Sequence, residues 1–146
     1  MSKSNSLETS ILDHILNNAN IANVGDATGL RGSTSAGSLY ISLHTADPGE
    51  AGSQTTSEAT FGGYARLAVS RSGGQWTVSG GSAQNAATLT FATCSSGSNT
   101  ITHVGIGTAL SGAGVLLYSG ALTSSLAVST GIAPQFGAGT ITLTED

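Results

Sequence analysis

Hydrophobic residues near the start of the chain recur at helical spacing. The leucines and isoleucines of segment 5–21 stand three and four residues apart, which places them on one face of an α-helix. They are Leu7, Ile11, Leu12, Ile15 and Leu16. Asn5 or Ser6 can cap the start of the helix, and Glu8 lies in the first turn, where the helix dipole favours a negative charge. The segment is predicted to form one amphipathic helix.

From residue 39 onward the period of the hydrophobic pattern changes to two, which predicts a strand with one buried and one polar face. The two alternating sets are Leu39, Ile41, Leu43 and Tyr40, Ser42, His44. Further strand-like segments follow between glycine- and serine-rich turns, at 64–69, 75–78, 86–91, 100–106, 115–118, 122–128 and 139–144. About eight short strands predict an all-β fold, an antiparallel β-sandwich or jelly roll with one N-terminal helix.

A segment rich in glycine and serine, 22–38, separates the helix from the strands. It is too polar to form a core of its own, and it is long for an unstructured connection inside a compact domain. We therefore expect an extended arm that a partner surface orders. The predicted organisation is a helix and extended arm over 1–38, followed by a β-sandwich or jelly-roll domain over 39–146.

Charge is scarce along the whole sequence. Only 8% of residues are charged, against about a quarter in an ordinary domain, and glycine, serine, threonine and alanine make up 81 of 146 residues. The net charge is −4, and the four basic residues form no stripe that could neutralise phosphates or anionic lipids. There is no run of 18 apolar residues and no signal-peptide pattern. We therefore expect a protein partner, and neither nucleic acid nor a membrane.

One cluster of titratable residues could carry chemistry. His44, Asp47 and Glu50 are close in the sequence, and a metal site or an acid–base pair is conceivable there. However, residues 47–49 are Asp-Pro-Gly, which is typical of a turn in which the aspartate bonds its own backbone. No second pair of ligands accompanies His44. The turn is the favoured interpretation.

The remaining reactive side chains are isolated. His14 is predicted on the polar side of the helix, and His103 is predicted to be packed and hydrogen-bonded in a strand. Cys94 is the only cysteine, so no intrachain disulfide can form, and we expect a buried thiol. We expect no catalytic residues, no cofactor and no metal, and the chain is not predicted to be an enzyme.

Two arginines flank a predicted strand. In a sequence with so little charge, we expect Arg66 and Arg71 each to pair with a carboxylate from a loop, such as that of Glu58 or Asp47. The alternative is that Arg66 reaches a carboxylate on another subunit.

Three aromatic residues leave a third class of function open. Tyr40, Tyr64 or Trp76 could stack on a sugar ring, as in a lectin-like module or a hydrolase. Jelly rolls host lectins, and a fold alone does not decide function. The favoured interpretation is that these aromatics fill a thin core that contains few other large residues.

Several motifs in order resemble a family of small structural proteins of tailed bacteriophages. The resemblance begins with the run Leu39 to Glu50, which contains Leu-His-Thr-Ala-Asp-Pro-Gly. It continues to near the end of the chain through Gly63–Arg66, Trp76–Val78, Asn85–Ala87, Thr90–Phe91, Thr102–Ile106, Leu116–Leu122 and Phe136–Leu143. Residues 1–38 are covered less well.

The resemblance implies a β-sandwich or jelly-roll component of the virion. Similar domains serve as head decoration, or cement, proteins, and others are labelled tail-fibre or minor tail proteins. We expect a cement protein made in the bacterial host's cytoplasm that binds the exterior of the phage head and joins major capsid proteins. The alternative is a tail or tail-fibre component. Self-association as a dimer or trimer is expected in either role.

The predicted contact surface lies in the N-terminal part. We expect Leu7, Ile11 and Ile15 on the helix, together with Arg31 in the arm, to contact the capsid or a neighbouring subunit.

Overall fold

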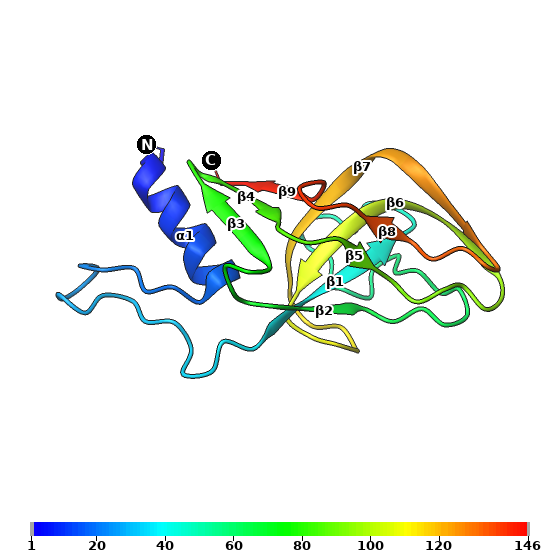
Figure 1. Ribbon diagram of the computed structural model, residues 1–146, viewed down its shortest axis with the longest axis horizontal. Helices are drawn as coiled ribbons and strands as arrows, with labels where there is room; N and C mark the ends of the chain where they lie inside the picture. Colours follow the sequence, from blue (N-terminus) through cyan, green and yellow to red (C-terminus); the bar gives the residue numbers. More distant parts are fainter. Residues whose placement is uncertain (1, 146) are drawn as a thin grey trace. The chain divides into compact units, whose positions relative to one another are not determined.

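The computed structural model describes residues 2–145, which contain one helix and nine strands (Figure 1). The helix is α1 (Asn5–Asn17). The strands are β1 (Ser38–His44), β2 (Leu67–Ser70), β3 (Trp76–Ser79), β4 (Ser82–Asn85), β5 (Leu89–Thr90), β6 (Ser98–Gly107), β7 (Leu116–Ser129), β8 (Gln135–Phe136) and β9 (Thr142–Thr144). They form three sheets with the orders β2-β1-β6-β7, β3-β4-β9 and β5-β8. The predicted class, an antiparallel sandwich-like β fold with one N-terminal helix, is confirmed.

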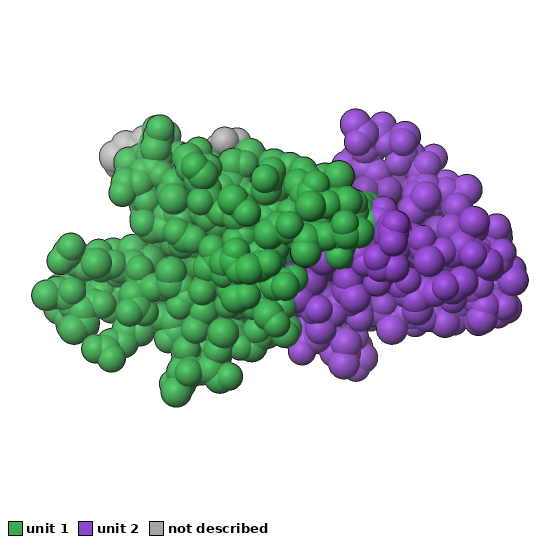
Figure 2. Space-filling view, in the orientation of Figure 1, with its two compact units in different colours: residues 1–38, 70–88, 136–146 green, residues 39–69, 89–135 purple. Residues whose placement is uncertain are grey.

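The chain divides into two compact units, coloured separately in Figure 2. Unit 1 contains the residues up to 38, residues 70–88 and the residues from 136 onward. Unit 2 contains residues 39–69 and 89–135. The predicted boundary after residue 38 coincides with one boundary between the units. The division into an arm over 1–38 and a domain over 39–146 stays a prediction.

Helix α1 is shorter than the predicted segment 5–21. Its N-cap is Ser4 rather than the predicted Asn5 or Ser6, and the Ser4 hydroxyl accepts a hydrogen bond from the Leu7 amide at 3.3 Å. The helix ends at Asn17 because Asn18 adopts a left-handed conformation with φ of 58°. Asparagine tolerates this conformation better than most residues, and it commonly closes a helix.

In unit 1 the helix packs on the hairpin of β3 and β4 (Figure 1). Its fully buried residues are Leu12 and Leu16, and Trp76 at the start of β3 is buried as completely. At the β3–β4 turn, the amide of Gly81 donates to the Thr9 hydroxyl at 2.9 Å. The apolar stripe of the helix is therefore used largely within the chain itself.

The predicted arm is partly ordered by its own chain. Ile21 and Leu30 form an isolated antiparallel bridge, which closes a small loop. The Asn18 side chain bonds the backbone of Ser33 twice, as acceptor at 2.7 Å and donor at 2.9 Å. These contacts within the chain order part of the segment, because asparagine side chains replace missing backbone partners. Ordering of the arm by a partner surface stays a prediction.

Among residues 2–145, no carboxylate lies within ion-pair distance of Arg71, so the predicted loop carboxylate of Glu58 or Asp47 is not its partner. Its guanidinium donates to the carbonyls of His14 and Ile15, both at 2.6 Å, and to that of Ala36 at 3.2 Å. The last carbonyls of a helix lack backbone donors and carry partial negative charge. These carbonyl oxygens therefore accept hydrogen bonds from the Arg71 guanidinium in place of a carboxylate.

In unit 2, strand β1 is central in its sheet and buried on both faces, whereas the sequence predicted one polar face. The register explains the difference. Ser42 lies opposite Gly105 of β6, and a side chain at Gly105 would come within 2.7 Å of the polar atoms of both Ser42 and His44. The missing side chain on the neighbouring strand makes room for polar residues in the interior.

Candidate functional site

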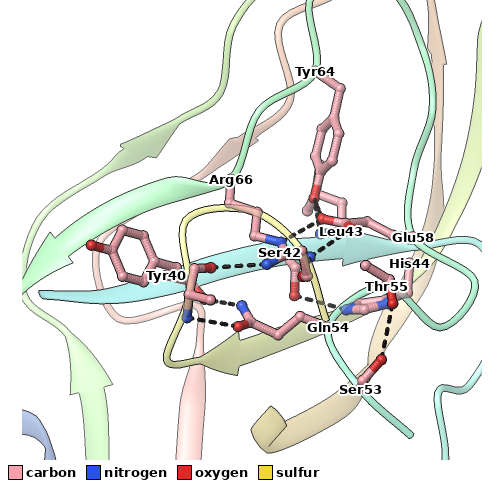
Figure 3. Close-up of polar contacts among 12 residues, drawn as sticks. Tyr40, Ser42, Leu43, His44, Ser53, Gln54, Thr55, Glu58, Tyr64 and Arg66 are labelled. Atoms are coloured by element: carbon pink, nitrogen blue, oxygen red, sulfur yellow. Dashed lines mark hydrogen bonds and ion pairs between the residues drawn. The ribbon is translucent and has the colours of Figure 1, made fainter. Parts of the chain in front are cut away.

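Unit 2 contains a group of polar side chains drawn into its interior (Figure 3). We call it the buried polar cluster, and its members are Ser42, His44, Gln54, Glu58, Tyr64 and Arg66. They come from β1, from the loop that follows β1, and from the segment that leads into β2. Burial of polar groups is costly unless each finds a partner, so their contacts indicate what the cluster does.

The centre of the cluster is an ion pair. Arg66 donates from Nε to Oε1 of Glu58 at 2.7 Å and from one terminal nitrogen to Oε2 at 2.8 Å. This two-point contact confirms the predicted pairing of Arg66 with Glu58. The Tyr64 hydroxyl donates to Oε1 of Glu58 at 2.9 Å and accepts from the Leu43 amide at 3.1 Å.

These contacts shift the protonation equilibria of both partners of Glu58. Hydrogen bonds to the carboxylate are the main cause that raises the pKa of Arg66. Burial raises the pKa of the Tyr64 phenol, and the charge of Glu58 adds to the rise. The guanidinium therefore stays charged and the phenol stays neutral, so neither group is poised for proton transfer near neutral pH.

The same residues hold the loop between β6 and β7, residues 108–115. Arg66 donates to the carbonyls of Ala109 at 2.9 Å and Gly112 at 2.8 Å. The side-chain oxygen of Gln54 accepts from the backbone amide of Ala109 at 2.9 Å, and the backbone amide of Gln54 donates to the Ala113 carbonyl at 2.9 Å. Four bonds from two buried residues therefore fix the loop backbone.

His44 and Ser42 form a second part of the cluster. Nδ1 of His44 lies 2.8 Å from the Thr56 carbonyl, and Nε2 lies 2.8 Å from the Ser42 hydroxyl. Because a carbonyl can only accept, Nδ1 carries the hydrogen and Nε2 accepts from serine. Burial lowers the pKa of His44 below its ordinary value of 6.5, which keeps the ring neutral.

A serine hydroxyl that donates to a histidine ring nitrogen is the arrangement of a catalytic nucleophile and its general base. Here, however, neither Ser42 nor His44 is accessible to a substrate. Ser42 and His44 are both fully buried, and Gly105 packs against their polar atoms. A nucleophile must reach a substrate carbonyl, and this serine has no open side. The contacts of the pair serve to fix the strand β1 against the loop at Thr56.

The turn and the other histidines have local partners. The carboxylate of Asp47 accepts from the Gly49 amide at 2.9 Å, so the predicted turn is confirmed. His14 bonds the Ala19 carbonyl at 2.7 Å, and His103 is half-buried and bonds Thr102 at 2.9 Å. Within residues 2–145, no three histidine, cysteine, aspartate or glutamate residues are grouped to hold a metal ion.

Cysteine and the aromatics fill interior positions to different degrees. Cys94 is buried, as predicted, and its thiol donates to the Ser96 carbonyl. Trp76 is fully buried in unit 1, which agrees with its predicted role in the core, whereas Tyr40 and Tyr64 are half-buried.

The predicted contact residues lie in unit 1 and are exposed unequally. Leu7 and Arg31 are exposed, while Ile11 and Ile15 are half-buried beside the fully buried Leu12. The helix therefore presents less apolar surface than its sequence predicts. A contact of these residues with another protein stays a prediction.

Sequence reasoning missed Gln54. It lies in a polar loop, and nothing in its neighbourhood of the sequence distinguishes it. Its importance comes from two distant glycines, Gly107 and Gly114, since a Cβ atom at either would overlap its side chain. Such a fit is visible only once the strands are paired.

Together, an all-β fold and a buried cluster that secures a surface loop characterise a structural and contact-forming protein. The family model described as Gp80, podophage GP4 fiber I protein gp80, matches residues 2–144. The chain therefore belongs to this family of phage virion structural proteins. The match includes residues 2–38, which the resemblance noted in the sequence covered less well. The family is one of structural fibre proteins rather than of enzymes. No curated protein matches the chain.

Over residues 2–145, no helix has the length and apolar character needed to cross a lipid bilayer.

Proposed function

We propose that this protein is a fibre component of the phage virion, which acts by contact with other virion proteins. The observation that carries this proposal is the match of a podophage fibre family to nearly the whole chain, residues 2–144. It favours the tail-fibre alternative over the cement role expected from the sequence. Copies of this chain and other virion proteins are its proposed partners, and neither nucleic acid nor lipid has a part in the proposed role.

The arrangement of the buried polar cluster supports a role by contact. Its donors and acceptors are directed at the backbone of loop 108–115 and at strand β1. An enzyme or a small-ligand site would instead need polar groups that converge on an open pocket. A fixed loop gives a partner protein a surface that loses little conformational freedom on binding.

Imaging of the intact particle tests the proposal. Cryo-electron microscopy, combined with gold-labelled antibodies against the purified chain, should place the protein in fibres attached to the particle. Regular density over the capsomers of the head would overturn the fibre role. It would instead support the cement role, with the major capsid protein as the partner.

A further inference from the structure

The ring of His44 fixes the middle of the loop that follows β1. Nδ1 of this fully buried histidine donates to the Thr56 carbonyl at 2.8 Å. We define the anchor segment as residues 53–58, in which Gln54 and Glu58 stand on either side of Thr56 (Figure 3). The bond from His44 therefore holds the anchor segment at its centre.

The anchor segment in turn holds loop 108–115. Gln54 bonds the backbone of this loop at two points, both at 2.9 Å. Glu58 binds Arg66 with both carboxylate oxygens, and the same guanidinium donates to two carbonyls of the loop. A displacement of the anchor segment would therefore remove the support of loop 108–115 from both sources at once.

A second proton on the His44 ring does not fit the closed arrangement. Nε2 accepts from the Ser42 hydroxyl, and Gly105 packs against both polar atoms. A protonated Nε2 can no longer accept, and the charged ring would be held away from water. β1 and β6 are paired over five residue pairs, whereas the anchor segment belongs to a loop. Opening of the loop is the less costly way to bring water to the ring, because separation of the strands would break the whole ladder.

The charged groups around the ring oppose the second proton as well. Glu58, Arg66 and His103 act on His44, and His103 lies opposite it on β6. Of these groups only Glu58 favours a charged ring, and its oxygens already accept from Arg66 and Tyr64. Burial is the main cause that lowers the pKa of His44, and Arg66 and His103 lower it further. The closed site therefore resists protonation, and an opened site would not.

We infer that His44 is an acid-sensitive switch. When Nε2 of its ring takes up a proton from solvent, the anchor segment moves away from β1 and loop 108–115 loses its fixed conformation, while the strands stay paired. Hydrogen bonds break in this step, and covalent bonds other than the one to the added proton do not change. The inference concerns the chain itself, so it holds for a fibre location and a head location alike.

Hydrogen exchange of the purified full-length chain tests the inference. The reporters are the amides of Gln54 and Ala109, which bond between the anchor segment and loop 108–115. Their protection, corrected for the intrinsic effect of pH on exchange, is compared at about pH 7.5 and about pH 5.5. It should fall between about threefold and about tenfold, because the opened ring takes up a proton with the ordinary pKa of 6.5. Unchanged protection would overturn the inference.

Urea distinguishes a local opening from unfolding of the whole protein. Opening of the anchor segment exposes little surface, so the protection of the two reporters at the lower pH should depend only weakly on low concentrations of urea. Amides in the ladder between β1 and β6 should be better protected, and their protection should fall steeply with urea. Equal protection and equal urea dependence in both groups would mean that acid acts by unfolding the whole protein, and would overturn the inference.

His44→Gln removes the group that takes up the proton and should abolish the fall in protection of both reporters. His103→Gln is the matched control, since it makes the same substitution at the half-buried ring on the opposite strand. It should keep the fall. A fall that persisted in His44→Gln, or that was lost in His103→Gln, would overturn the inference. If His44→Gln failed to fold, the urea dependence of the unmodified chain and the His103→Gln variant would still decide.

Discussion

Of the described residues, unit 1 buries one polar side chain, that of Asn85, whereas unit 2 buries four, those of Ser42, His44, Gln54 and Arg66. In unit 1 the helix and the hairpin enclose apolar residues, with Leu12, Leu16 and Trp76 fully buried. Unit 2 also has an apolar core, but it adds an ion pair and a serine–histidine pair to its interior. Apolar burial holds elements together without specifying loop conformation. Polar burial specifies it, as the bonds from Arg66 and Gln54 to the backbone of loop 108–115 show.

The largest expected effect comes from the core of unit 1. Trp76→Ala should lower the free energy of unfolding by about 4 kcal/mol, because it leaves a large cavity against the helix. Urea denaturation measures the change. Thr77→Ala is the control, since Thr77 is exposed on the same strand and should change stability by less than about 0.5 kcal/mol. A similar small effect for both would contradict the view that Trp76 anchors unit 1.

The next effect comes from the ion pair of unit 2. Glu58→Ala should destabilise the protein by about 3 kcal/mol, because it leaves the Arg66 guanidinium buried without its counter-charge. Glu50→Ala, at an exposed position of the same loop, is the control. Hydrogen exchange should show faster exchange at residues 108–115 in Glu58→Ala only. If hydrogen exchange at residues 108–115 were unchanged in Glu58→Ala, the ion pair would not be what fixes the loop.

In unit 1, the charged side chain of Arg71 has a structural role. Arg71→Ala should cost about 2 kcal/mol, because the His14 and Ile15 carbonyls lose a charged donor. Arg31→Ala removes the same charge from an exposed position and should be nearly neutral. Circular dichroism and urea denaturation measure helix content and stability. Equal effects of the two substitutions would mean that overall charge, rather than the closure of the helix, is responsible.

The smallest expected effect is a pH dependence confined to unit 2. The lowered pKa of His44 means that the unfolded chain binds a proton at higher pH than the folded one. Stability should be complete above pH 6.5 and decline as the pH falls below this value. The charged or titratable groups that act on His44 are Glu58, Arg66 and His103.

Substitution of single histidines shows which residue causes the dependence of stability on pH. His44→Gln should flatten the dependence of stability on pH in this window, where carboxylates are still ionised. His103→Gln should preserve it. If the slope survived in His44→Gln, the titration would belong to another histidine.

The periodic parts of the sequence were predictable. Spacing of three and four residues identified the helix, and alternation identified strands such as β1 and β6, because both periods are set by local geometry. Alternation missed β4 and β8, and the two strands predicted at 115–118 and 122–128 are one strand, β7. The turn at Asp47 and the Arg66–Glu58 pair were also anticipated. These predictions rest on neighbours in the sequence or on the scarcity of charge.

The remaining features depend on which distant residues meet. The interior position of His44 requires Gly105 across the sheet, and the role of Gln54 requires two glycines far along the chain. Arg71 donates to carbonyls at the end of the helix instead of to a carboxylate, because the tertiary structure places its guanidinium beside His14 and Ile15. The exposure of Leu110 and Val115 likewise could not be inferred, since leucine and valine also fill buried positions of the strands.

The fit of Gln54 between Gly107 and Gly114 divides the hairpin into tolerant and intolerant positions. Any larger residue at those glycines would displace Gln54, whereas Leu110 and Ser111 contribute no side-chain atom to the bonds that hold the backbone. Substitution of Leu110 or Ser111 therefore leaves the bonds that fix the loop in place, whereas substitution of either glycine disturbs them. The loop carries replaceable outward residues on a base whose residues are fixed by packing.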